Sequence, residues 1–262
     1  GAMNYASLQE LQMVNNTLIP SYLDISYASF ASLLPHAGKE LDINLFLAHR
    51  EVEILQVKAN VELASHTYSH YYCLEEGQTI EDFENDVRMA KENAIKQGVN
   101  LVSIIFPRNQ VNDDYLTICR KYGFTHFRGM LNSFLYKPSK TPFRYSPMGA
   151  LRFLDTYLNI SGNNTYTIED TKSKELIDVP GSRFFRPYSR KLSFLEGLKI
   201  RRIKQSMTDA AKNGRIYHLW WHPHNFGTYM QENLSLLEEI CRHFDYLKKT
   251  YNLKSSFISE IR

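Results

Sequence analysis

The hydrophobic pattern changes period several times after about residue 50. Short, continuous apolar runs of strand length alternate with stretches in which apolar residues recur every three or four positions, the period of an amphipathic helix. The predicted strands are 61–64, 101–106, 125–127, 215–221 and 255–258, and the predicted helices are 80–97, 112–122, 190–213 and 234–251. Alternation of strands and helices is typical of a parallel α/β sheet or barrel.

Several predicted helices carry end signals. Thr79 can cap the helix over 80–97, Glu81 and Asp82 stand in its first turn, and Gly98 can stop it. Gly214 can end the helix over 190–213 in the same way. The run 101–106 (LVSIIF) has the length and the apolar character of a strand buried on both faces.

The domain organisation predicted from this pattern is simple. Residues 1–3 are interpreted as a tag remnant with Met3 as a candidate start, and 4–262 as a single domain. The segment from about 132 to 188 is less periodic and rich in Tyr, Asn, Ser and Pro. We expect it to be an irregular excursion that serves as a lid or a substrate cover.

Composition narrows the function classes. The 262 residues contain 31 Lys+Arg and 28 Asp+Glu, and the net charge of +3 gives no support to nucleic-acid binding. No apolar run reaches the roughly 18 residues of a membrane span, and no signal-peptide pattern opens the chain. Cys73, Cys119 and Cys241 are odd in number and widely spaced, which favours reduced thiols in a cytoplasmic protein.

Three polar motifs follow predicted strands, and in parallel α/β folds such strand ends gather the chemistry at one face. The first contains His66 and His70. Four residues apart on a helical turn, both imidazoles could reach one metal ion, which would lower the pKa of bound water. An arbitrary pair at this spacing is more often structural. The preceding strand and the neighbouring Ser and Thr residues favour the metal interpretation here.

The other two motifs offer catalytic groups. Arg108 lies in the loop 106–110, where backbone N–H groups could stabilise an oxyanion, although a plain strand-to-helix turn is the commoner explanation. His222 and His224 follow the strand that holds both tryptophans, and one of them could act as a general acid on a leaving amine. The tryptophans themselves are either core residues or stacking surfaces for a sugar.

Together these motifs resemble the polysaccharide deacetylase family of NodB-like carbohydrate esterases. Residues 62–70 (ELASHTYSH) are similar to the family motif Glu-Ile-Gly-Ser-His-Thr-x-Ser-His. The segments 71–78, 106–110, 186–188 and 218–225 bring the chain closest to the WbmS-like subgroup of O-antigen biosynthesis proteins. The resemblance runs from about residue 50 to the C-terminus.

The resemblance implies a distorted, incomplete (β/α) barrel and a divalent metal, with zinc as the first choice. It implies that His66 and His70 bind the metal, and that Arg108, His222 and His224 serve catalysis. The implied reaction is the hydrolysis of an acetyl group, mainly N-acetyl, on an acetylated aminosugar or polysaccharide precursor in bacterial O-antigen or capsule biosynthesis. Which of the two late histidines is the acid stays open.

The chain also departs from the family pattern. Ile105 and Arg108 stand where the third motif has an arginine and an aromatic residue. No strand ending in paired aspartates precedes His66; Asp24 and Asp42 are the nearest candidates, so the sequence identifies no third protein ligand. We expect the first barrel strand to be missing through truncation, a mis-assigned start or degeneration, leaving a sheet edge that residues 4–35 or a second copy could cover.

Two functions therefore stay open. One is a deacetylase whose activity is impaired by the missing aspartates. The alternative is a non-catalytic carbohydrate-binding relative, whose 17 Tyr and 15 Phe could supply stacking surfaces.

Overall fold

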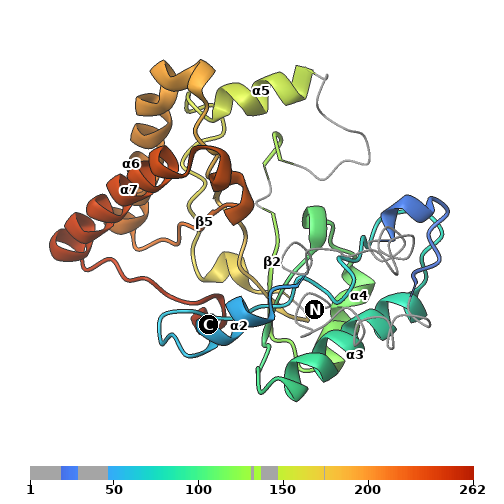
Figure 1. The fold of residues 1–262 in the computed structure, drawn as a ribbon. Coiled ribbons are helices and arrows are strands. Elements are labelled where there is room, and N and C mark those ends of the chain that lie inside the picture. The colour runs from blue at the N-terminus through green and yellow to red at the C-terminus, as the bar shows by residue number, and fades with distance from the viewer. Residues whose placement is uncertain (1–18, 29–46, 131–132, 137–146, 174) are drawn as a thin grey trace. The chain divides into compact units, whose positions relative to one another are not determined.

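The computed structural model describes residues 19–28, 47–130, 133–136, 147–173 and 175–262. Residues 1–3 and Asp42 lie outside these ranges. The chain divides into two compact units, which are described separately (Figure 1). Unit 1 comprises the described residues up to Gly129 with Ser173–Asp178 and Phe257–Arg262, and unit 2 comprises those of Met130–Lys172 and Val179–Ser256. The single domain over 4–262 stays a prediction.

Unit 1 contains a parallel sheet whose strands are ordered β1 (Ser103–Ile105), β2 (His126–Arg128) and β3 (Ile177–Asp178). In this register Ile104 lies opposite Phe127, and Phe127 lies opposite Asp178. Ser65 adds a parallel bridge to Ile104. Because all these segments run in the same direction, their carboxyl ends lie at one edge of the sheet.

The helices of unit 1 are α2 (His49–Gln56), α3 (Ile80–Lys96) and α4 (Asp113–Lys121). The predicted cap of α3 is confirmed, because the Thr79 hydroxyl accepts from the Asp82 N–H and the Asp82 carboxylate accepts from the Thr79 N–H, each at 3.1 Å. Side chains of α3, α4 and β1 share one core, whose buried members include Phe83, Val87, Ile104, Phe106, Leu116 and Phe127.

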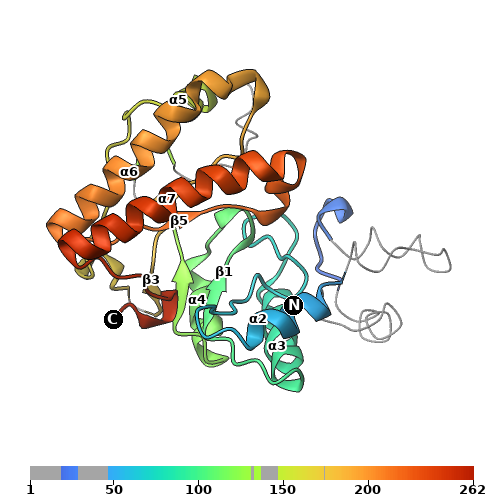
Figure 2. The same cartoon turned by 60° about the vertical axis from the view of Figure 1, so that its left-hand side comes forward.

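Unit 2 is built on two long helices, α6 (Glu196–Asn213) and α7 (Met230–Tyr251), which lie side by side (Figures 1 and 2). It also contains α5 (Pro147–Asp155) and a parallel pair of short strands, β4 (Arg183–Phe184) and β5 (Leu219–Trp220). Its core contains Phe185, Ile200, Ile203, Met207, Phe226, Ile240 and Leu247.

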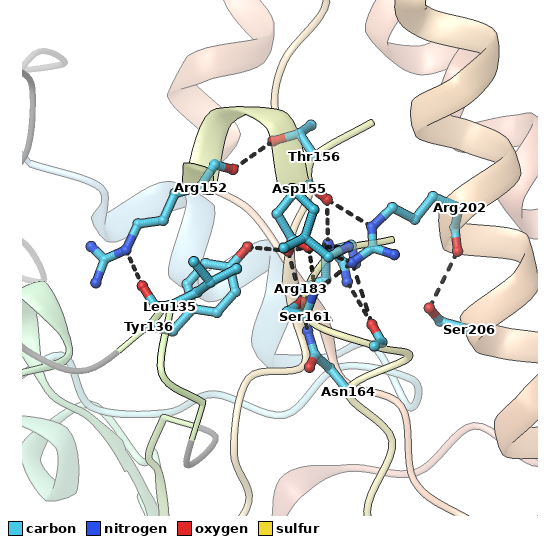
Figure 3. Close-up of polar contacts among 12 residues, drawn as sticks. Leu135, Tyr136, Arg152, Asp155, Thr156, Ser161, Asn164, Arg183, Arg202 and Ser206 are labelled. Atoms are coloured by element: carbon cyan, nitrogen blue, oxygen red, sulfur yellow. Dashed lines mark hydrogen bonds and ion pairs between the residues drawn. The ribbon is translucent and has the colours of Figure 1, made fainter. Parts of the chain in front are cut away.

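A buried carboxylate joins three elements of unit 2. Asp155 at the end of α5 pairs with Arg202 of α6 at 2.8 Å and with Arg183 of β4 at 3.3 Å (Figure 3). It also accepts hydrogen bonds from the Tyr136 hydroxyl at 2.7 Å and from the Ser161 backbone and hydroxyl at 2.7 and 2.8 Å. Burial alone would raise the pKa of Asp155, but these hydrogen bonds and Arg183 hold it below its ordinary value.

The α/β class is confirmed, and so are the helices that have clear end signals. Gly214 adopts the left-handed conformation that ends α6. The structure adds a cap that was not predicted, because Asn112 accepts the Asp114 N–H at the start of α4. The strands are shorter than predicted. Within the described residues they form the two sheets given above, so the (β/α) barrel stays a prediction. None of the described helices is both long and apolar enough to cross a membrane.

Other predictions were wrong. The segments 61–64 and 255–258 are not strands, and only the Ser65 bridge continues the sheet beside β1. The C-terminal residues do not pair with the sheet as a strand. They contact it through a side chain, since His126 Nε2 of β2 lies 2.9 Å from the Ile261 carbonyl oxygen. The supposedly irregular stretch 132–188 includes α5, β3 and β4 among its described residues, and α2 was not predicted at all.

We expect Asp155→Asn to lower the free energy of unfolding by about 3 kcal/mol or more, because it leaves two buried guanidinium groups without a counter-charge. Both tryptophans lie in unit 2, so urea titration followed by tryptophan fluorescence reports on this unit. Asp245→Asn, on the exposed side of α7, is the matched control and should shift stability by less than about 0.5 kcal/mol. Equal effects of the two substitutions would contradict the role of Asp155.

Candidate functional site

The histidine pair lies in a loop of unit 1 and not on a helical turn. Thr67 and His70 have φ angles of 64° and 60°. A β-branched residue with positive φ cannot belong to a right-handed helix, so the helical part of the prediction was wrong. The loop nevertheless brings the exposed rings of His66 and His70 together, with centroids 4.8 Å apart and planes at 73°.

Asp86 of α3 holds this loop from behind. Its carboxylate accepts the Tyr68 N–H at 2.6 Å, the Ser69 N–H at 2.9 Å and the Ser69 hydroxyl. The side chain is 5% exposed, and burial raises the pKa of Asp86 against the hydrogen bonds from Ser69 and Tyr68, which lower it. The backbone of the loop is thus held by contacts with α3.

A second contact orients His66. Its Nδ1 atom lies 2.8 Å from the carbonyl oxygen of Ile105, at the end of β1. A carbonyl can only accept, so Nδ1 carries a hydrogen, and in the neutral ring the lone pair is then on Nε2. This is the arrangement in which metal-binding histidines are commonly held, with the second nitrogen donating to a backbone carbonyl.

Arg108 lies close to the histidine pair. Its guanidinium group packs over the Tyr72 ring at 4.2 Å and over the Tyr27 ring at 5.2 Å, and it forms an ion pair with Glu75 at 3.1 Å. The ring of His70 approaches the same Tyr72 at 5.1 Å, edge to face. His70 and Arg108 therefore both contact Tyr72, and His66 joins them through its contact with His70.

Backbone strain is concentrated in these two loops. Among the described residues, the non-glycine positions with positive φ are Thr67, His70, Arg108, Asn109, Asn164 and Asn252. Asn109, Asn164 and Asn252 are asparagines, which adopt this conformation readily. The first four lie in the histidine loop and in the Pro107–Asn109 turn after β1. Strain of about 1–3 kcal/mol per residue persists where the surroundings enforce it, most often at functional sites.

His222 and His224 belong to unit 2. They follow β5 at the start of the Pro223–Tyr229 segment, and their rings stack at 5.3 Å with planes at 21°. His222 also contacts Phe184 at 5.6 Å and Trp220 at 5.7 Å. Trp221 stacks on Phe226 at the core of the unit. A cleft shared with His66 and His70 stays a prediction.

Sequence reasoning missed Asp178. It ends β3, at the same edge of the unit 1 sheet as the Ser65 and β1 ends, and accepts the Gly129 N–H at 2.8 Å. A Cβ atom at position 129 would collide with its carboxylate. Burial raises the pKa of Asp178 to about 6. A perturbed carboxyl group at a strand end is a functional candidate, and its position after the apolar pair 176–177 was the available signal.

Neither earlier aspartate candidate gains support from the described residues. Asp24 accepts the Ser26 N–H at 3.0 Å and caps the turn Ile25–Tyr27, while Asp42 lies outside the described ranges. Among the described residues, no group of three or more His, Cys, Asp or Glu side chains is arranged to hold a metal ion.

The chain matches no protein-family model, no curated protein and no solved structure.

We expect Asp86→Asn to lower the free energy of unfolding by about 1–3 kcal/mol, because an amide NH₂ group would face N–H or O–H donors that have lost their acceptor. Urea titration followed by circular dichroism measures this. Glu92→Gln is the matched control, because it also converts a carboxylate of α3 into an amide but does so on the exposed side of the helix. A loss no larger than that of the control would contradict the anchoring role of Asp86.

Asp178→Asn should raise the free energy of unfolding relative to the unsubstituted chain as the pH increases. Because the folded pKa of about 6 lies above the ordinary value of 3.8, the contribution of Asp178 is most favourable below pH 3.8 and is lost as the pH rises through 6. The advantage of the variant should grow between pH 4 and pH 6.5 and level off at up to about 3 kcal/mol. Urea titrations across this range test it, and a pH-independent difference would refute it.

Proposed function

We propose that this chain carries the metal-binding framework of a sugar N-deacetylase of the polysaccharide deacetylase type. The reaction would be hydrolysis of an acetyl group, mainly N-acetyl, on a sugar or polysaccharide precursor. The observation that best supports it is the His66–His70 pair, with rings 4.8 Å apart and the Nδ1 atom of His66 bonded to a backbone carbonyl. Imidazole nitrogens are ligands that zinc prefers, so zinc is the proposed metal.

The residues of the chain would divide the work. His66 and His70 would hold the metal, which when bound supplies an activated water for attack on the acetyl carbonyl. The loop at Arg108 would stabilise negative charge developing on that carbonyl oxygen through the Arg108 N–H and guanidinium groups. The Asn109 and Gln110 N–H groups already donate to carbonyls of the same turn. His222 or His224 would protonate the leaving amine.

The proposed fold is a distorted, incomplete (β/α) barrel. It is supported by the parallel order of Ser65, β1, β2 and β3 and by the parallel pairing of β4 with β5. In such barrels catalytic groups sit at the carboxyl ends of strands, and each proposed residue follows such an end.

A specific observation also favours the non-catalytic alternative. The Tyr72 ring lies beside His70 and the Tyr27 ring lies beside Tyr72, and aromatic rings of this kind stack on sugars. A carbohydrate-binding relative would keep this aromatic surface without needing a metal. Zinc binding at His66 and His70 separates the two functions.

We expect zinc to bind this chain weakly through His66 and His70, because two neutral imidazoles leave the charge of the ion uncompensated. Isothermal titration calorimetry should show binding that both His66→Ala and His70→Ala abolish. His49→Ala, which removes a histidine elsewhere in unit 1 that pairs with Glu53, should leave binding unchanged. Zinc binding that survives both site substitutions would refute the metal assignment.

Amine release from N-acetylglucosamine oligomers should be low for the same reason, since no aspartate base has been identified to deprotonate the attacking water. Full activity would show that another carboxylate has taken this role, and Asp178→Asn would then test the strongest candidate.

A further inference from the structure

The loop Arg186–Ser189, which follows β4 in unit 2, is held by three polar side chains from α6 and α7. The Lys199 ammonium group donates to the Arg186 carbonyl at 2.9 Å. The Asn233 side chain accepts the Tyr188 N–H at 2.6 Å, and the Glu196 carboxylate accepts the Ser189 N–H at 3.4 Å. Lys199 is 2% exposed and Asn233 is 0% exposed.

Burying these polar side chains carries a desolvation penalty that lowers the stability of the fold. Lys199 and Glu196 form an ion pair inside the protein, and burial lowers the pKa of Lys199 although Glu196 opposes the shift. A buried ion pair often stabilises a protein no better than apolar residues of the same volume. What it provides here is a fixed backbone, since both partners and Asn233 bond main-chain atoms of the same four-residue loop.

The fixed loop presents positive charge. Arg186, Arg190 and Lys191 are exposed, and the segment 179–195 contains no Asp or Glu. Within the described residues, no carboxylate forms an ion pair with any of these three, whereas the buried Arg183 is paired with Asp155. The Arg186 guanidinium packs 5.5 Å from the Phe153 ring, which restricts its orientation.

The loop lies beside the late histidines of the same unit. β4 and β5 are parallel and Phe184 lies opposite Trp220, so the chain leaves both strands at one edge. The ring of Phe184 contacts His222, and Tyr188 packs edge to face against Tyr229 at 5.4 Å. A cationic loop, aromatic rings and two histidines therefore share one edge of unit 2.

We propose that this edge binds an anionic group of the substrate, a phosphate or a carboxylate attached to the sugar, with Arg186 as its main charged contact. The identity of the sugar rests on the proposed deacetylase function, but the anion site does not. Lys199, Glu196 and Asn233 are positioning residues, because they act through the loop backbone. Guanidinium groups suit this task because they bind phosphate and carboxylate with two parallel hydrogen bonds.

The test is calorimetric titration of the full chain with pyrophosphate, glucuronate and neutral N-acetylglucosamine. We expect one or both anions to bind, with Arg186→Gln weakening the binding by at least about tenfold and Arg186→Lys by less. Preference for pyrophosphate identifies a phosphorylated sugar, and preference for glucuronate identifies an acidic sugar. Arg215→Gln, which removes an exposed arginine elsewhere in unit 2, should leave the affinity unchanged.

The positioning role has its own readout. The double variant Lys199→Met/Glu196→Gln removes the loop contact and both buried charges together, so no charge is left without its partner. It should weaken anion binding several-fold without the loss of thermal midpoint expected of Lys199→Met alone. Failure of both anions to bind, or equal affinities in Arg186→Gln and the unsubstituted chain, would overturn the proposal. Neither result depends on zinc binding or amine release, so failure of the anion site is distinguishable from failure of the deacetylase proposal.

Discussion

The contacts of the Asp86 carboxylate with the loop behind the histidines are the interaction on which the candidate site depends. One buried side chain accepts from Tyr68 and Ser69, and these bonds force the chain to reverse between His66 and His70. α3 can hold the loop in place because it is itself fixed. A capping box stabilises its N-terminus, and its buried Phe83 and Val87 belong to the same core as β1. The rings of His66 and His70 meet because α3, which follows them in the sequence, holds the backbone between them in a strained conformation.

Unit 2 likewise uses buried polar side chains to hold a strand and the loop that follows it. Asp155 binds Arg183 of β4, and Lys199 with Asn233 holds the loop that follows the same strand. Burying charge inside a helical pair gains little stability by itself. Its consistent gain in this protein is geometric, because each buried group bonds backbone or side chains that would otherwise have several conformations.

The parts predictable from sequence were those determined locally. Thr79 begins α3 and Gly214 ends α6 through contacts within a few residues, and the apolar run around Ile104 had to be buried. Strands of two or three residues, such as β3 and β4, carry too few positions to show a period. The histidine loop escaped prediction because its conformation depends on Asp86, which lies in α3 and is not a neighbour of the loop in the sequence. The shifted pKa of Asp178 likewise arises from burial that no local pattern reveals.

Charge balance decides what the histidine pair can hold. A divalent cation at His66 and His70 would meet neutral imidazoles on one side and the positive Arg108 beyond Tyr72. Glu75 pairs with Arg108 and cancels that charge, while the Asp86 carboxylate is directed at backbone N–H groups behind the loop. The local surroundings are therefore close to neutral, neither repelling a cation nor neutralising one. Under the proposed function, a further carboxylate beside the pair would supply the missing negative charge and strengthen metal binding.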